Sequence, residues 1–436
     1  MNRPIRNRSR FAESRKVSKI ANLALIWTLL VTVLAGFSRV QADEPLPPIS
    51  ERARAIHAAG ILIDGHNDLP YRLHSVGNFT LDKYDISKRL TSGQTDIPRL
   101  REGGLKAQFW SVFIGSDQPH PARTVIEQID LVKRMAARYP DAFEMAGTVD
   151  DVERIVAAGK IASLIGIEGG VAIENNFAQL RAFYELGARY MTLTHNSTLE
   201  WVDAANDKPK HGGLTEFGER VVKEMNRLGM LVDISHVSAD TMDDVLRVTK
   251  SPIIASHSSA YAVCPVPRNV PDEILKKIKL NGGVVMVNFY TDFVVPADAK
   301  KRREAFLDLK NKIADPAARE AEAKKLLAED PKASRSPRGT IEDVADHIDH
   351  IVKIAGIDHV GIGSDFDGIT STPVGLADVS DYPRLTDELL RRGYSETDIH
   401  KILGRNVLRA LRGAESVAKQ LRATTPPEVD SGAGFR

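Results

Sequence analysis

Short apolar runs alternate with amphipathic stretches along the chain from about residue 45 onward. The runs have the length of buried strands and cover residues 61–67, 106–114, 162–168, 190–195, 230–235, 253–257, 284–289 and 359–364. Apolar residues at helical spacing lie between them, as in Thr124–Arg138, Asn176–Leu186, Thr215–Leu228 and Ala239–Val248. Gly187 and Gly229 follow two of these stretches, where a helix end favours a residue with positive φ. The alternation predicts a parallel α/β sheet.

The number of predicted strands narrows the fold class further. Eight parallel strands with helical crossovers can close into a barrel. We therefore predict an α/β protein with a TIM-like (β/α)8 barrel that occupies residues 43–415. In such barrels the functional side chains gather at the carboxyl ends of the strands.

Potential metal ligands stand at the ends of five predicted strands. His66 and Asp68 close the run ILIDGHND two residues apart, and alternation along a strand points both side chains the same way. Four later runs end in one candidate each, at Glu168, His236, His257 and Asp365. Imidazoles mixed with carboxylates suit a hard-to-borderline divalent metal ion. The pattern predicts a metal centre at one end of the barrel.

A hydrolytic centre with two metal ions about 3.5–4 Å apart needs a ligand that reaches both. Glu168 offers two oxygens, and Gly169-Gly170 would let the backbone approach closely. His66 and Asp68 could then hold one ion, and His236 and His257 the other. The pair would activate a shared water and polarise a carbonyl. Asp365 is placed to orient that water and carry its proton.

Each of these residues also has a purely structural interpretation. His66 could cap a turn, and Asp68 could bond the loop before Pro70. Glu168 could be an ordinary loop carboxylate. The serine-rich surroundings of His236 and His257 suit hydrogen-bonded histidines. The coincidence of five strand ends favours the metal centre over these interpretations taken one at a time.

Two further residues fit the same pocket. His195 ends the fourth predicted strand in MTLTHNS and could donate to the oxyanion of a tetrahedral intermediate. Arg268 follows the sixth strand in PVPRNVPD and could pair with a substrate carboxylate through its planar fork. An arginine there could equally anchor the loop.

Composition places the chain among ordinary globular proteins. Its 436 residues are 42% hydrophobic and 27% charged, with a formal net charge of +1. Cys264 is the only cysteine, so the chain has no internal disulfide and no cysteine-based zinc site.

The N-terminal residues have the pattern of a secretory signal. Seven Lys or Arg and one acid, Glu13, precede an apolar stretch from Ile20 to Phe37, and Val40-Gln41-Ala42 offers small residues to a signal peptidase. We predict cleavage after Ala42, with export to the periplasm or the medium. The alternative is an uncleaved membrane anchor, since the stretch is close to the length that spans a bilayer. Cleavage would remove eight positive charges and one negative, leaving about −6, which argues against nucleic acid as a partner.

Two segments depart from the barrel pattern. Residues 296–338, rich in Lys, Arg, Glu and Ala, predict one or two solvated helices inserted after the seventh strand, with a lid over the barrel mouth as the alternative. Residues 416–436 predict a disordered tail without a lipid-anchor signal. The remaining histidines, among them His57 and His347, are expected at the surface.

The ordered motifs of the chain resemble one protein family. LIDGHNDLP, IEGG, YMTLTHNS, GMLVDISHVS, PIIASHSSAY, RNVPD, MVNFY and GSDFDG are similar, in this order, to the blocks of the membrane (renal-type) dipeptidases. The resemblance covers about residues 55–415. It implies a zinc-dependent barrel related to the amidohydrolases, which hydrolyses dipeptides, including those with a C-terminal D-residue, and in some members β-lactams of the carbapenem type.

Residue by residue, the resemblance implies roles for the candidates already named. His66 and Asp68 would bind one zinc ion, His236 and His257 the other, with Glu168 between them. His195 would contact the scissile carbonyl, Arg268 the C-terminal carboxylate, and Asp365 would receive and return a proton. Val171 stands where relatives often have His, so loop contacts and substrate preference are expected to differ here.

The resulting hypothesis is an exported dizinc dipeptidase of bacterial type, with dipeptides as substrates. The animal enzymes' disulfide cysteines and lipid-anchor tail are absent, so neither dimerisation through a disulfide nor surface attachment carries over from them, and a homodimer of another kind stays open. One alternative is another metal-dependent amidohydrolase that opens lactones, cyclic amides or β-lactams. A second is a catalytically silent, zinc-dependent peptide-binding protein.

Overall fold

The computed structural model describes residues 46–75 and 80–430, and the expected signal segment at residues 1–42 lies outside these. Eight parallel strands close into a ring in the order β1, β2, β4, β5, β6, β7, β8, β9, because β2 pairs with β4 and β1 with β9. Their bounds are Leu62–Asn67 (β1), Leu105–Phe113 (β2), Ile161–Glu168 (β4), Ala188–Thr192 (β5), Leu231–Asp233 (β6), Ile254–Ala255 (β7), Val284–Val287 (β8) and Val360–Ile362 (β9). The predicted (β/α)8 barrel is confirmed.

All eight predicted strands belong to the ring, and one strand was missed. β3 (Phe143–Met145) pairs with the first residues of β4 and stands outside the closed ring. Three residues are too short for hydrophobic alternation to identify a strand. The four helices predicted by amphipathic spacing are confirmed as α5, α7, α8 and α9, with boundaries within three residues.

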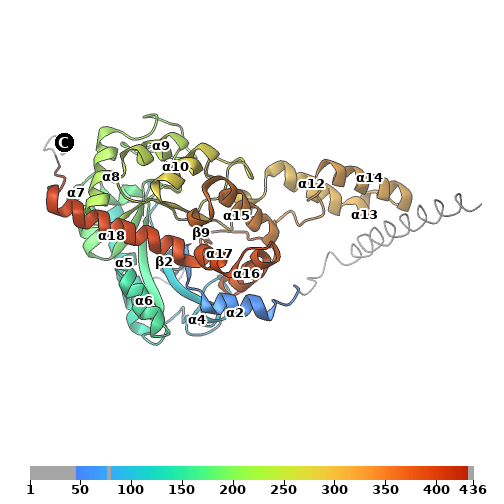
Figure 1. The fold of residues 1–436 in the computed structure, drawn as a ribbon, viewed down its shortest axis with the longest axis horizontal. Coiled ribbons are helices and arrows are strands. Elements are labelled where there is room, and N and C mark those ends of the chain that lie inside the picture. The colour runs from blue at the N-terminus through green and yellow to red at the C-terminus, as the bar shows by residue number, and fades with distance from the viewer. Residues whose placement is uncertain (1–45, 76–79, 431–436) are drawn as a thin grey trace, which may run out of the picture.

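Helices surround the ring, and α18 lies along one side of the body (Figure 1). The helices before the insertion are α2 (Glu51–Ala59), α3 (Leu69–Ser75), α4 (Ile97–Glu102), α5 (Pro121–Arg138), α6 (Val149–Ala157), α7 (Phe177–Glu185), α8 (Glu216–Leu228), α9 (Ala239–Val248), α10 (Asp272–Asn281) and α11 (Thr291–Val294). Those after it are α15 (Ile341–Ala355), α16 (Tyr382–Arg391), α17 (Glu396–His400) and α18 (Asn406–Thr424). α8 shows why apolar residues at helical spacing predicted these helices. It buries Val221, Val222 and Met225, and it is capped by Gly229, which has a φ of 84°.

The insertion after β8 is helical, as predicted. α12 (Ala297–Leu307), α13 (Leu309–Lys312) and α14 (Pro316–Glu329) project away from the barrel (Figure 1). They share a small apolar cluster of their own around Phe306 and Ala323. Arg303 at its base forms a buried ion pair with Asp343 of α15, 2.8 Å between Nη2 and Oδ1. None of the side chains of 296–338 that the structure describes lines the cavity described below, so the structure does not support a lid.

Two expectations need correction. The tail predicted from residue 416 is helical to Thr424, because the amphipathic pattern of α18 continues through the buried Ala418. Beyond the helix, Glu428 pairs with Arg220 at 2.8 Å, and residues 431–436 lie outside the described chain.

His57 and His347 are buried, not exposed as expected. His347 accepts a hydrogen bond from the Ala260 N–H, and its Nε2 lies 3.0 Å from the Val294 carbonyl. Burial lowers the pKa of His347 to about 4, so the ring is neutral and ties the loop after β7 to the end of α11. Polar partners of this kind, which come from distant segments, leave no mark in the local sequence.

Candidate metal centre

A cavity of about 480 Å³ opens at the carboxyl ends of the barrel strands. Acidic and imidazole groups occupy its floor, and aromatic side chains form part of its wall. The lining residues are Asp68, Tyr71, Phe113, Glu168, His195, Asn196, Asn206, His236, Tyr290, Phe293, Asp365, Asp367, Gly368, Ile369 and Thr370. This is the end of the barrel where the sequence placed the candidate ligands.

His66 and Asp68 at the end of β1 point to the same place. The Nε2 of His66 lies 3.2 Å from Oδ2 of Asp68, and both residues are buried. Backbone pairing fixes this strand end, since the Asp68 N–H donates to the Phe366 carbonyl at 2.9 Å. The prediction from strand alternation that these two groups face one way is confirmed.

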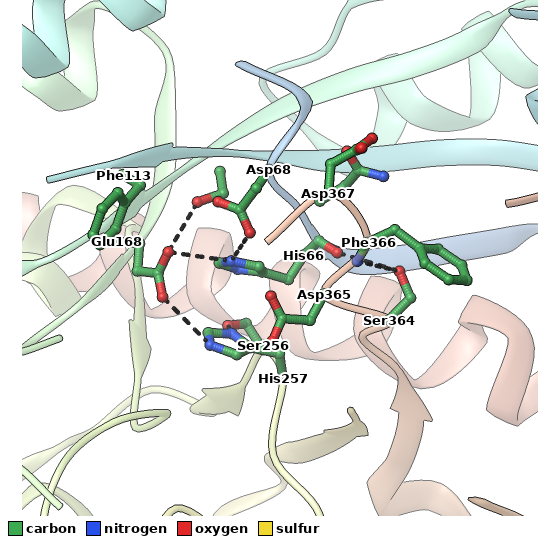
Figure 2. A network of polar contacts seen from close by, with 12 residues as sticks. His66, Asp68, Phe113, Glu168, Ser256, His257, Ser364, Asp365, Phe366 and Asp367 are labelled. Atoms are coloured by element: carbon green, nitrogen blue, oxygen red, sulfur yellow. Dashed lines mark hydrogen bonds and ion pairs between the residues drawn. The ribbon is translucent and has the colours of Figure 1, made fainter. Parts of the chain in front are cut away.

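Glu168 stands between the histidines that come from three different strand ends. Its Oε2 lies 3.3 Å from Nε2 of His66, while its Oε1 lies 3.0 Å from Nε2 of His236 and 3.5 Å from Nε2 of His257. Figure 2 shows Glu168 between His66 and His257. The glycines after it are needed, because a Cβ on Gly170 would lie 2.2 Å from the Leu193 carbonyl oxygen. The two oxygens of the Glu168 carboxylate thus face different imidazoles: one faces His66, and the other faces His236 and His257.

His236 and His257 form the second half of the cluster. Their Nε2 atoms lie 2.9 Å apart, and His236 has a left-handed backbone with φ of 69°. Burial, together with Arg268 and neighbouring histidines, lowers the pKa of both imidazoles well below the ordinary value. Both rings are therefore neutral near pH 7, the form that binds a metal ion.

The electrostatic field at His66 favours a cation. Burial alone lowers the pKa of His66, but Tyr190, Asp68 and Glu168 raise it well above its ordinary value. Burial raises the pKa of Glu168, yet the three histidines outweigh this and hold it well below its ordinary range. The buried Nε2 of His66, which has no hydrogen bond in the described chain, faces carboxylate oxygens of Asp68 and Glu168. A divalent cation between His66, Asp68 and Glu168 would bind both the nitrogen and the carboxylate oxygens.

Asp365 completes the His66 side of the centre. One ligand atom each from His66, Asp68 and Asp365 lies within 4.8 Å of the others. Asn288 donates to Oδ2 of Asp365 at 2.8 Å and fixes the carboxyl group. Burial, with Asp68 and Glu168 nearby, raises the pKa of Asp365 well above its ordinary value. The residue is thus suited to carry a proton.

His195 lies on the wall of the cavity beside this cluster. Its ring centroid is 4.5 Å from that of His236 and 4.6 Å from that of Phe113. Burial lowers the pKa of His195, which favours the neutral ring. His195 could also join Glu168 and His236 as a third ligand, since their ligand atoms lie within 4.8 Å of one another.

Arg268 is placed differently from the other candidates. It is 1% exposed and does not line the cavity, and its guanidinium lies over the ring of Phe293, which does. It donates to Ser258 Oγ at 3.2 Å and to the His257 carbonyl at 3.3 Å, but its buried Nε has no partner in the described chain. Burial lowers the pKa of Arg268 to about 10, so it stays charged. The structure shows both the loop anchor and an unused donor.

Sequence reasoning missed the residues that hold the ligands in place. Tyr190, Ser256 and Asn288 each contact a candidate ligand through a hydroxyl or an amide. Ser256 and Asn288 stand at the ends of predicted strands, and this position could have identified them as neighbours of the candidate ligands. Tyr190 reaches His66 across the barrel, and the local sequence around either residue does not predict that contact. Val171, singled out earlier, packs on the core and does not line the cavity.

The donor set fits divalent metal ions, because three buried imidazoles and the carboxyl groups of Asp68, Glu168 and Asp365 form groups of three whose ligand atoms lie within 4.8 Å of one another. A closed parallel barrel with such a cluster at its carboxyl end has the arrangement of a metal-dependent hydrolase. Residues 50–425 match the model of one such family, the membrane dipeptidases, peptidase family M19. The chain belongs to this family.

Solved structures agree with the family assignment. The probable dipeptidase PvdM from Pseudomonas aeruginosa is 25% identical, with a TM-score of 0.70 over 84% of this chain and 98% of its own. A metallopeptidase from Rhodobacter sphaeroides, bound to a phosphinate mimic of the dipeptide L-Ala-D-Ala, is 26% identical, with a TM-score of 0.65 over 81% and 99% of the two chains. Among the described residues, no helix has the length and hydropathy needed to cross a membrane.

Proposed function

We propose that this chain is a dizinc dipeptidase that cleaves the single peptide bond of small dipeptides, including those with a C-terminal D-residue. The observation that carries the proposal is the position of Glu168, whose two oxygens face His66 on one side and His236 and His257 on the other. A bound dipeptide mimic in the similar Rhodobacter enzyme supports the substrate class.

The residues present divide into two ligand sets. His66 and Asp68 would hold one zinc ion, His236 and His257 the other, and Glu168 would serve both. When bound, the two ions would polarise the scissile carbonyl and lower the pKa of a water molecule toward neutrality. Zinc suits this set because it accepts mixed imidazole and carboxylate ligands without a fixed geometry.

The remaining residues bind the dipeptide and move the proton. His195, on the cavity wall, would donate to the scissile carbonyl oxygen. Arg268 would attract the free C-terminal carboxylate with its unpartnered Nε. Asp365, held by Asn288, would take the proton of the attacking water and return it to the leaving amine. Both products are then free amino acids.

Metal removal tests the proposal directly. Purified protein is expected to hold close to two zinc ions per chain by elemental analysis and to cleave dipeptides in a panel assay. Dialysis against a chelator should abolish cleavage, and zinc alone should restore it, because the proposed reaction relies on the ions to activate the water and polarise the carbonyl. Full activity in protein shown to be metal-free would contradict the proposal.

We propose in addition that the chain is exported and matures by cleavage after Ala42. The basic residues 1–19, the apolar stretch 20–37 and the small residues that follow support this. N-terminal sequencing of the protein from a fractionated bacterial host should find Asp43 first, in the periplasm or medium. An intact N-terminus in the membrane fraction would instead support the uncleaved anchor.

A further inference from the structure

Tyr190 is a buried tyrosine that crosses the interior of the barrel. It lies on β5 and is fully buried, and its ring centroid is 5.2 Å from that of Phe109 on β2. Its hydroxyl reaches β1, where it contacts both Gly65 and His66. The side chain thus spans the ring of strands from one side to the other, below the cluster of metal ligands.

A single glycine makes this crossing feasible. Gly166 of β4 pairs directly with Tyr190, and a Cβ at that position would lie 1.9 Å from Cζ of the tyrosine ring. Any other residue at 166 would occupy the volume of the ring. Gly166 also precedes Glu168 by two residues on the same strand, so the path of the ring and the bridging carboxylate are set by one segment.

The hydrogen bonds of Tyr190 determine the tautomer of His66. The hydroxyl donates its only proton to the Gly65 carbonyl at 3.1 Å. Its oxygen lies 2.9 Å from Nδ1 of His66 and must therefore accept from that nitrogen. Nδ1 then carries the ring proton, and Nε2, which lies beside Asp68 and Glu168, is the nitrogen left to bind a metal ion.

The other half of the centre repeats this arrangement. Ser256 donates its proton to Oδ2 of Asp233 at 2.6 Å, and its oxygen lies 2.8 Å from Nδ1 of His257. A hydroxyl that is already committed as a donor again accepts from Nδ1 and leaves Nε2 free. Two unrelated hydroxyls with the same relation to two histidines argue against a chance contact at Tyr190.

We infer that Tyr190 is a positioning residue for the metal centre, which holds His66 in its ligating tautomer and orientation in the space that Gly166 leaves open. The inference rests on the proposed two-metal function. Outer partners of this kind typically contribute about 10–100-fold to metal affinity. The effect should fall on the ion bound by His66, because Tyr190 contacts no other histidine ligand by hydrogen bond in the described chain.

Tyr190→Phe removes the hydroxyl and keeps the ring, so it tests this role without a cavity. The matched control is Tyr394→Phe, which removes a hydroxyl that donates to Asp349 at 2.7 Å on the helical surface. Zinc per chain would be measured for both variants and the wild type in a series of chelator-buffered free zinc concentrations. Thermal unfolding of the metal-stripped proteins would report any loss of fold.

We expect Tyr190→Phe to release one of its two ions at about 10–100-fold higher free zinc than the wild type does. Activity should return when zinc is raised, and Tyr394→Phe should titrate like the wild type. Zinc occupancy of Tyr190→Phe equal to that of the control at every concentration would overturn the inference. A wild-type protein that binds no zinc would instead overturn the proposed function, and the wild-type titration detects this independently.

Discussion

Glu168→Ala is expected to lower kcat/KM for dipeptides by about a thousandfold, the upper end of the range for loss of one preorganised electrostatic group in an active site. Glu168 is the one carboxylate whose two oxygens address both halves of the cluster, at 3.3 Å from His66 and 3.0 Å from His236. Without it, the His236 and His257 pair keeps no carboxylate of its own and lies in the field of the Arg268 cation. Metal content should fall together with activity.

The measurement is kcat/KM with zinc per chain determined on the same sample. Glu144→Gln serves as the control, because Glu144 is a glutamate of β3 whose ion pairs with Arg154 and Lys160 lie on the surface. Surface pairs contribute little to stability, so this variant should retain full activity and two ions. Full activity in Glu168→Ala would refute the bridging role, whatever the metal content.

The strands and the candidate metal ligands were predictable because both follow from local patterns. Periodicity places His66 and Asp68 on one face, and the rule that barrel strands end at one mouth then gathers Glu168, His236 and His257 from distant segments. The structure confirms that these side chains meet, within 3.5 Å of Glu168 for each histidine. Their roles as zinc ligands remain proposals.

What the sequence left open depends on contacts between distant residues. The crossing of Tyr190 over Gly166 requires knowledge of which strands are neighbours and of how rings fill the interior. His347 was expected outside and lies inside, since its two backbone partners, in the loop after β7 and in α11, are brought together only by the folded barrel. β3 was missed because three residues carry too little pattern.

Arg268→Met is expected to separate the two interpretations of this arginine. The substitution keeps a long side chain and removes the charge, so loss of a carboxylate contact should cost about 2–5 kcal/mol, roughly 30-fold or more in kcat/KM. The loss should appear with Gly-D-Ala, mainly as a higher KM. The C-terminal amide of the same dipeptide lacks the carboxylate, so its slow hydrolysis should change little.

A loop anchor predicts a different result, which makes the comparison decisive. Arg268 donates to Ser258 and to the carbonyl of the candidate ligand His257, so loss of a purely structural arginine would disturb the centre itself. The kcat/KM values for Gly-D-Ala and for its C-terminal amide would then fall by the same factor, and the zinc content of the protein would fall as well. Arg303→Met, which removes a buried arginine at the base of the α12–α14 insertion, controls for burial alone. The unpartnered Nε leads us to expect the selective loss, since buried donors are nearly always satisfied and the dipeptide carboxylate is the acceptor that the proposed reaction brings.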